Sequence, residues 1–215
     1  MNRLFLSIGA GPGMGASTAG RFAREGFDLM LAARDVSKLE QLAESIRKQT
    51  GRSVENVTLD ATDFRAVQDL AERFGSALTV VHYNAAAMQT TDVFETPMET
   101  IERNLRVDIA GALAAVKYFA PYMEERRKGT VLLTGGGFAL SPNAEYLTLS
   151  IGKAGIRCMV EALFPQLAAQ GIHIATLTVM RVVSPGSEDA MEAAEAFWKL
   201  YSQPEGQWEW EATLR

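Results

Sequence analysis

A glycine-rich turn between an apolar run and an amphipathic stretch constrains this sequence more than any other feature. Residues 9–15 read GAGPGMG, and the apolar run at 4–8 before them is predicted to be a buried strand. Residues 16–25 after them place alanine and phenylalanine on one face of a predicted helix and charged residues on the other. A strand, a glycine turn and a helix aim backbone N–H groups and a helix N-terminus at a phosphate. The turn therefore predicts a phosphate-binding loop.

Two glycine spacings fit this turn. Gly11, Gly13 and Ala16 satisfy the dinucleotide fingerprint G-x-G-x-x-G/A. Gly9, Gly13 and Gly15 satisfy a second spacing, G-x-x-x-G-x-G. Glycine is needed because a Cβ there would block the approach of a pyrophosphate or forbid the dihedral angles of the turn. Because a predicted strand and helix flank the turn, both spacings favour a dinucleotide site over a merely structural turn.

The rest of the sequence alternates predicted strands and helices. Further strands are expected at 27–33, 54–59, 78–83, 130–134, 172–180 and, as a short edge strand, 208–214. Helices are expected from a cap at Asp35 to 48, after 63 to about 74, at 97–127 with a break near Asn104, and at 144–170 and 187–201. Repeated βα units predict an α/β fold with a doubly wound parallel sheet, and residues 1–215 are expected to form one domain.

Composition excludes several classes of protein. The net charge of −5 argues against a nucleic-acid partner. No apolar run approaches the ~18 residues that a membrane span needs. Cys158 is the only cysteine, so an intrachain disulfide is excluded and a reducing compartment is expected. The two histidines lack metal-ligand spacing, so no metal site is predicted. We therefore expect a cytoplasmic protein that binds a small molecule, whose identity the sequence does not reveal.

The residues after the second predicted strand bear on which dinucleotide binds. An NAD site normally carries an acid there, hydrogen-bonded to the ribose 2′-OH. Here Ala33 is followed by Arg34, whose guanidinium can bind a 2′-phosphate bidentately. Lys38, one turn into the next helix, would add a second positive charge, and Asp35 is interpreted as the helix cap. The charge favours NADP over NAD, and a solvated surface arginine is the alternative.

Taken in order, these features and several later motifs resemble the short-chain dehydrogenase/reductase family from residue 1 to about 201. The matching segments are the glycine turn, ARD at 33–35, DATD at 60–63, YNAA at 83–86, VDIAG at 107–111 and KAG at 153–155. The resemblance implies a three-layer αβα Rossmann fold with about seven strands, and a homodimer or homotetramer packed through two long helices. The cofactor-binding residues expected on this basis are Gly9, Gly11, Gly13, Met14, Gly15, Arg34, Lys38, Asp60, Ala61, Asn84, Ala85, Ala86, Lys153 and Val182.

The catalytic residues of the family are only partly matched. Its members usually carry Asn, Ser, Tyr and Lys, with the proton-exchanging Tyr four residues before the Lys. Lys153 fits the Lys position, but Leu149 stands where Tyr is expected. The Ser position falls on Gly136, and the Asn position falls on Asp108. The segment that carries a substrate lid in the family is cut to about 181–187, so an open, wet pocket is expected.

Other groups are available to move a proton. On a continuous helix, Tyr146 would share a face with Leu149, about one turn further from Lys153. Its alternative role is to line the substrate pocket. Asp108 could relay a proton or cap a local turn, and water could also act. The catalytic candidates are therefore Lys153, Asp108 and Tyr146.

Two functions stay open. The first is an NADP-dependent oxidoreductase with an altered active site, acting on a carbonyl or hydroxyl compound. The second is a non-catalytic NADP(H)-binding or interaction protein, because Leu149 and Gly136 remove groups that do the chemistry. A domain that has lost the nucleotide as well is least favoured, since Gly9, Arg34 and Lys153 are kept.

Overall fold

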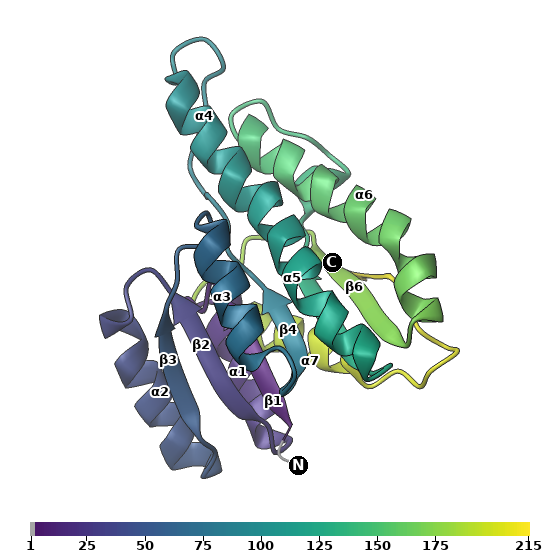
Figure 1. The fold of residues 1–215 in the computed structure, drawn as a ribbon. Helices are drawn as coiled ribbons and strands as arrows, with labels where there is room; N and C mark the ends of the chain where they lie inside the picture. The colour runs from purple at the N-terminus through teal and green to yellow at the C-terminus, as the bar shows by residue number, and fades with distance from the viewer. Residues whose placement is uncertain (1–2) are drawn as a thin grey trace.

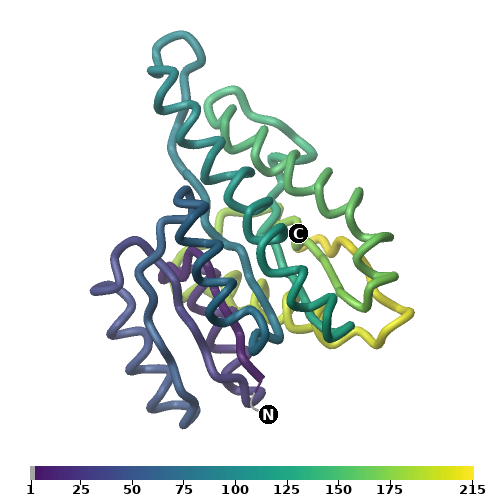
Figure 2. Tube along the Cα trace, in the orientation of Figure 1, coloured from purple at the N-terminus to yellow at the C-terminus, as the bar shows by residue number. Residues whose placement is uncertain are grey.

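The fold is built on one sheet of seven parallel strands, seen in a computed structural model that describes residues 3–215 (Figures 1 and 2). The spatial order is β3-β2-β1-β4-β5-β6-β7, and every neighbouring pair is parallel. The order reverses between β1 and β4, which defines a doubly wound sheet. The strands are Leu4–Ile8 (β1), Asp28–Ala33 (β2), Val54–Thr58 (β3), Leu78–Tyr83 (β4), Gly129–Thr134 (β5), Ile172–Val179 (β6) and Glu211–Leu214 (β7).

Helices cover both faces of this sheet. One apolar cluster joins the sheet to α3, α5 and α6, and a second joins it to α1, α2 and α7. The helices are Met14–Arg24 (α1), Ser37–Thr50 (α2), Phe64–Phe74 (α3), Met98–Leu105 (α4), Gly111–Glu125 (α5), Leu147–Ala169 (α6) and Glu188–Tyr201 (α7), with a π-helical turn at Arg106–Ala110 (η1) and a 3₁₀ turn at Gly137–Ala139 (η2). The three-layer αβα Rossmann fold expected from the sequence is therefore confirmed.

The central strands are buried on both faces. Every residue of β5 and β6 is buried, including the polar residues His173, Thr176 and Thr178 of β6. Some element ends differ from the sequence-based expectation. The edge strand β7 begins at Glu211 rather than at Trp208. The α2 helix takes its N-cap at Val36 rather than at Asp35, although the Asp35 carboxylate still accepts a hydrogen bond from the Ser37 N–H.

The expected break in the helical region after Pro97 is a π-helical turn. Its carbonyl at Val107 accepts a 2.6 Å hydrogen bond from the Tyr83 hydroxyl. A Cβ at Gly111, where α5 begins, would overlap that hydroxyl, so this crossing requires glycine. Turns of this kind are frequent at functional sites, and this one contains Asp108.

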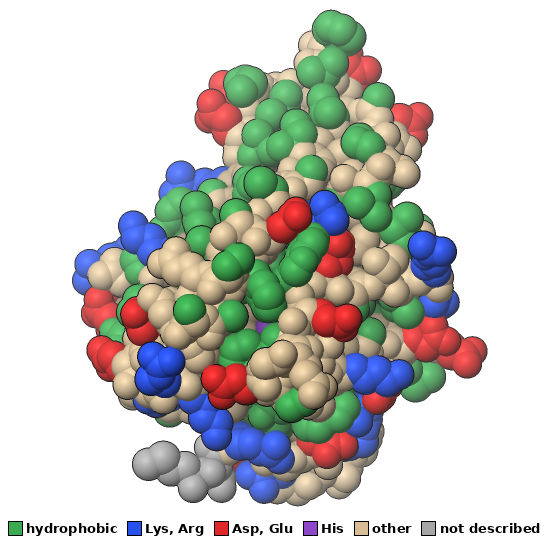
Figure 3. Space-filling view, turned by 90° about the vertical axis from the view of Figure 1, so that its right-hand side faces the viewer, with side chains coloured by type: hydrophobic (Ala, Val, Ile, Leu, Met, Phe, Trp, Pro, Cys, Tyr) green, Lys and Arg blue, Asp and Glu red, His purple; other side chains and the backbone are tan. Residues whose placement is uncertain are grey.

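The loop before α4 and the start of α4 project beyond the rest of the molecule (Figures 1 and 2). A space-filling view shows hydrophobic side chains gathered on this projection (Figure 3). Phe94 in the loop is 92% exposed, and Met98 at the start of α4 is 59% exposed. Among residues 3–215, no helix combines the length and the apolar character that crossing a bilayer requires.

Candidate functional site

The glycine turn lies at the carboxyl end of β1 and leads directly into α1. Gly9 has φ +83°, and a Cβ there would overlap the backbone of Ala85. A Cβ at Gly15 would come within 2.9 Å of the Gly9 carbonyl oxygen. At Gly11 and Gly13, by contrast, a Cβ would point into open space, so the bare backbone faces the cavities described below. Gly9 and Gly15 permit the turn, and Gly11 and Gly13 keep room for a ligand.

The N-terminus of α1 has no side-chain cap. Gly13 occupies the N-cap position, and no side chain accepts a hydrogen bond there. In α3 and α7 the corresponding N–H groups are satisfied by Asp63 and Ser187. The Ala16 N–H donates a 2.9 Å hydrogen bond to the Gly11 carbonyl. Among residues 3–215, the Met14 and Gly15 N–H groups have no such backbone partner, so they are available to an anion, and the helix dipole favours negative charge at this end. This arrangement fits the diphosphate of a dinucleotide.

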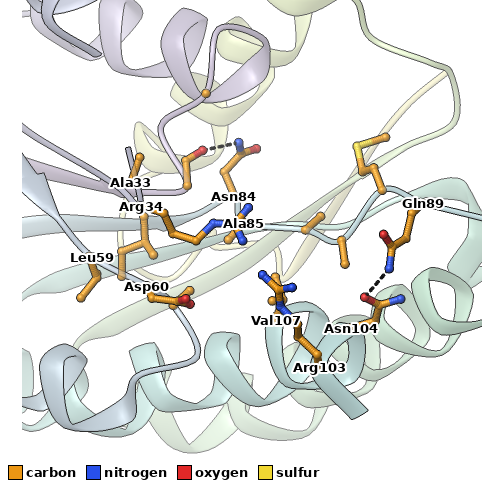
Figure 4. A pocket seen from close by; sticks show the side chains of 17 residues that line it. Ala33, Arg34, Leu59, Asp60, Asn84, Ala85, Gln89, Arg103, Asn104 and Val107 are labelled. Atoms are coloured by element: carbon orange, nitrogen blue, oxygen red, sulfur yellow. Dashed lines mark hydrogen bonds between the residues drawn. The ribbon is translucent and has the colours of Figure 1, made fainter. Parts of the chain in front are cut away.

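Two cavities flank the turn. The first, of about 510 Å³, lies at the carboxyl ends of β1 to β4 (Figure 4). The second, of about 540 Å³, lies between the turn, the end of β5, α6 and the segment after β6. Four residues line both cavities, which makes them parts of one cleft around the turn. These residues are Gly11, Asn84, Ala86 and Met88.

The first cavity holds most of the residues expected to bind the adenosine half of a cofactor. Arg34, Asp60, Ala61 and Ala85 all line it. Although partial burial acts against its charge, hydrogen bonds from Thr62 lower the pKa of Asp60 below its usual value. Asp60 is therefore ionised at neutral pH and faces the cavity as a carboxylate.

Lys38 is placed differently from this group. Its side chain is 80% exposed and lies 3.6 Å from the Asp35 carboxylate. It does not line either cavity. The second positive charge expected from α2 is thus directed to solvent and to Asp35 in this structure.

Arg103, which sequence reasoning did not identify, also lines the first cavity. It lies on α4, and Figure 4 shows its side chain pointing from that helix toward the cavity that Arg34 enters from the end of β2. Val107 lines the same cavity from one turn further on. Helical periodicity places Arg103 and Val107 on one face, but only the packing of α4 shows that this face lines the cavity.

Asn84 connects the turn to the central strands by a chain of hydrogen bonds. Its Nδ2 donates to the Gly9 carbonyl at 2.9 Å, and its Oδ1 accepts from the Thr134 hydroxyl at 2.9 Å. Because that hydroxyl donates to Asn84, the His82 Nε2 at 3.0 Å must be the donor to Thr134. Burial lowers the pKa of His82 to about 3, so the ring is neutral. His82 is a hydrogen-bonded core residue.

Lys153 lies in the wall of the second cavity. Its Nζ donates a 2.7 Å hydrogen bond to the Thr134 carbonyl. Burial lowers its pKa to about 8, while the negative charge of Asp108 opposes this change. Leu149 and Gly136 line the same cavity beside it. Where the catalytic Tyr and Ser were expected, the wall thus consists of a leucine side chain and a bare backbone.

Asp108 is buried behind these cavities rather than in their walls. The carboxyl group is part of a residue only 1% exposed, and one oxygen accepts a 2.6 Å hydrogen bond from the Ala87 N–H. The other oxygen has no hydrogen-bond partner in the described part of the chain. Burial raises the pKa of Asp108 to about 6, although the Ala87 hydrogen bond and the charge of Lys153 act in the opposite direction. This carboxyl can therefore exchange a proton near neutral pH.

Tyr146 does not lie on a continuous helix with Leu149, and this expectation was wrong. The α6 helix begins at Leu147 rather than at residue 144, and Tyr146 is its N-cap, with φ −120° and ψ 41°. The Tyr146 ring stacks on Phe138 at 5.5 Å between centroids, and the residue pairs with Thr91 in an isolated bridge. It does not line the second cavity. These contacts hold Tyr146 away from the face expected for a replacement acid.

The segment after β6 closes one side of the second cavity. Met180 to Val183 and Pro185 line it, and Val182 is 85% exposed. Methionine, leucine and phenylalanine side chains make much of the remaining wall, which suits an apolar or flat ligand. Within residues 3–215, no group of three or more His, Cys, Asp or Glu side chains could hold a metal ion.

Comparisons with known proteins agree with this geometry. The chain is similar to an uncharacterized oxidoreductase of Staphylococcus saprophyticus, with 26% identity over 201 residues that cover 92% of this chain and 83% of the relative. A short-chain dehydrogenase from Rhodopseudomonas palustris has the same fold, with a TM-score of 0.89, 24% identity, and coverage of 100% of this chain and 99% of the other. A metagenomic short-chain oxidoreductase in complex with NADP superimposes with a TM-score of 0.91 at 18% identity, covering 99% and 96% of the two chains.

A family profile decides the classification. The profile described as short chain dehydrogenase matches residues 3–194, which include the glycine turn, the strand ends around both cavities and Lys153. The expected resemblance is thus confirmed over most of the sequence. This protein belongs to the short-chain dehydrogenase family of oxidoreductases.

Proposed function

We propose that this protein binds NADP(H) and acts as an oxidoreductase with an altered active site on a carbonyl or hydroxyl compound. The cleft around the uncapped N-terminus of α1 carries this proposal, because the Cβ directions of Gly11 and Gly13 point into open space where a diphosphate would lie. Asn84, Ala85 and Ala86 supply a second stretch of small or amide side chains along the same cleft. When bound there, the nicotinamide would donate or accept a hydride.

The preference for NADP rests on charge. Arg34 lines the first cavity just after β2, where an acid would hold the ribose 2′-OH of NAD. A guanidinium binds a phosphate bidentately and strongly. A family member with the same fold has been solved with NADP, which supports the same assignment. Lys38 contributes less than expected, because it is held near Asp35.

Lys153 is proposed to position the nicotinamide ribose. The Thr134 carbonyl holds its ammonium group at the wall of the second cavity, and the other hydrogens of that group remain for a ligand hydroxyl. Asp108 is proposed to supply or receive protons through the buried region behind Ala87. Tyr146 stays a weaker candidate, because its ring is stacked on Phe138 outside the cavity wall.

The altered site predicts slow turnover. A general acid or base contributes about 10²–10⁴-fold to such reactions, and Leu149 provides neither. The apolar wall and the short segment after β6 also leave the second cavity partly open, so water can deliver the proton. The same observations favour the second candidate function, a non-catalytic NADP(H)-binding protein.

The remaining expectations are proposals of the same kind. The seven strands form one sheet, which supports a single domain over residues 1–215. Leu113 on α5 and Ile151 on α6 are 50% and 46% exposed, which supports a homodimer or homotetramer packed through these helices. The lone cysteine supports the proposal of a cytoplasmic location, and no helix within residues 3–215 could cross a membrane.

Titration of the purified protein with NADPH and NADH tests the proposal. Isothermal titration calorimetry should give a lower Kd for NADPH, and failure to bind either nucleotide would contradict both candidate functions. Stopped-flow mixing of the NADPH complex with a set of carbonyl compounds then separates the two. Loss of reduced nicotinamide absorbance above the rate in buffer supports the enzyme, and no loss with any compound supports the non-catalytic binder.

A further inference from the structure

Two arginines from distant parts of the sequence line the first cavity. Arg34 follows β2, and Arg103 lies in the last turn of α4. Figure 4 shows the two side chains entering the cavity from different elements, and Asp60, two residues after β3, lines the same cavity. In the part of the chain that the structure describes, neither guanidinium forms an ion pair with a carboxylate.

The charges around this cavity are unbalanced. Among the residues that line it, Arg34 and Arg103 are the only bases and Asp60 is the only acid. Both arginines act electrostatically on Asp60, which places all three charges in one region of the cavity. One oxygen of the Asp60 carboxylate already accepts two hydrogen bonds from Thr62. A net positive charge therefore faces the cavity and is suited to a doubly charged phosphate.

We propose that Arg103 is a second 2′-phosphate-binding residue that acts together with Arg34. This inference rests on the proposed function, and it makes selection between NADP and NAD depend on a pair of side chains from two elements. The diphosphate would occupy the other part of the cleft, at the uncapped N-terminus of α1. Arg34 and Arg103 are therefore left for the phosphate on the adenosine ribose. Two guanidinium groups can present several N–H donors to one phosphate and offset the repulsion from Asp60.

Nucleotide fragments isolate this contact from the rest of the cofactor. Adenosine 2′,5′-bisphosphate and adenosine 5′-monophosphate differ only in the 2′-phosphate. Calorimetric titration of the full chain with both ligands should show that R103Q raises the Kd of the bisphosphate by roughly 10- to 100-fold, as expected for lost charge-assisted hydrogen bonds. Binding of the monophosphate should change less than about 3-fold, and its retention also shows that the variant is folded.

Matched variants sharpen the test. R103K should keep part of the preference, because its charge remains but its bidentate geometry is lost. R24Q removes the same charge from an exposed position on α1 outside both cavities and should leave both fragments unaffected. The double variant R34Q/R103Q should bind the two fragments with nearly equal affinity. Raising the ionic strength should reduce the ratio of the wild-type affinities for the bisphosphate and the monophosphate, because salt screens the phosphate charge.

Several results would overturn the inference. Unchanged binding of both fragments by R103Q would show that Arg103 does not contact the ligand. If R103Q weakened the binding of both fragments equally, Arg103 would contact the adenine or the 5′-phosphate instead. In either case NADPH binding by the wild type would leave the proposed function intact. A wild type that binds neither fragment and neither dinucleotide would contradict the proposed function itself.

Discussion

Replacing Asp108 with asparagine should change how stability depends on pH. Relative to the wild type, the free energy of unfolding of D108N should increase as the pH rises from 4 to 7. Burial raises the pKa of this carboxyl from 3.8 to about 6. The folded state therefore holds the proton more tightly than the unfolded chain does. The stability associated with Asp108 is present in full below pH 3.8 and is lost as the pH rises through about 6. The asparagine variant has no proton to lose and avoids this loss.

The size of the effect follows from the same values. Each pKa unit corresponds to about 1.4 kcal/mol, so keeping Asp108 charged in the fold costs about 3 kcal/mol at pH 7 and above. Most of that cost develops between pH 4 and pH 7. The free energy of unfolding of D108N minus that of the wild type should therefore increase by about 2–3 kcal/mol over this range. An unpaired amide hydrogen would shift the whole difference by about 1–3 kcal/mol without changing its dependence on pH.

Urea unfolding followed by far-UV circular dichroism at pH 4, 5, 6 and 7 measures this difference. The protein concentration is held fixed, since assembly would add to the apparent stability. Lys153, whose pKa is lowered to about 8, remains largely protonated over the range. Contributions from titrating groups that do not interact with Asp108 cancel in the difference between the two proteins, whereas Lys153 does interact with it. D69N, which removes a carboxylate from an exposed position on α3, serves as the control.

A flat difference between D108N and the wild type would refute the reasoning, because it would mean that the carboxyl is as well solvated in the fold as in the unfolded chain. A difference that falls with pH would mean that the charged form is stabilised, as a close ion pair with Lys153 would achieve. In that case Asp108 would be held as a permanent carboxylate and could not relay protons near neutral pH.

Three further changes have defined outcomes. G9A forces a side chain into φ +83° and against the backbone of Ala85, so it should lose at least about 1–2 kcal/mol by thermal or urea unfolding, and calorimetry should detect no NADPH binding. L149Y places a phenol in the wall of the second cavity and should raise a weak carbonyl reductase activity by about 10²–10⁴-fold in a spectrophotometric assay. If the substrate binds but its turnover does not change, residue 149 does not lie at the active site. H82F should make the protein less sensitive to acid unfolding. Because the pKa of His82 is about 3 in the folded state, the free energy of unfolding of the wild type falls by about 1.4 kcal/mol for each pH unit below 6.5. Acid unfolding of the two proteins at the same pH would contradict this account.

Much of the fold was predictable because its signals are local. Apolar runs of strand length alternate with amphipathic stretches of helix length, and glycine marks the turn that no other residue permits at Gly9. The strand ends predicted from these runs bring Gly11, Asn84 and Thr134 to one edge of the sheet, as parallel strands require. The predicted start of α6 at residue 144 differs from the observed start at Leu147. Neither the start of α6 at Leu147 nor its N-cap at Tyr146 has a capping side chain to mark it.

The sequence by itself determined the doubly wound sheet, the bare glycine backbone and the absence of a phenol at Leu149, because each depends on residue type and on spacing along the chain. Only the tertiary structure decided that Arg103 shares a cavity with Arg34, whereas Lys38 does not. It also decided that Asp108 is buried with one carboxyl oxygen unpaired. These features arise where elements distant in sequence pack together, and the position and desolvation of a charge depend on all the surfaces that meet there.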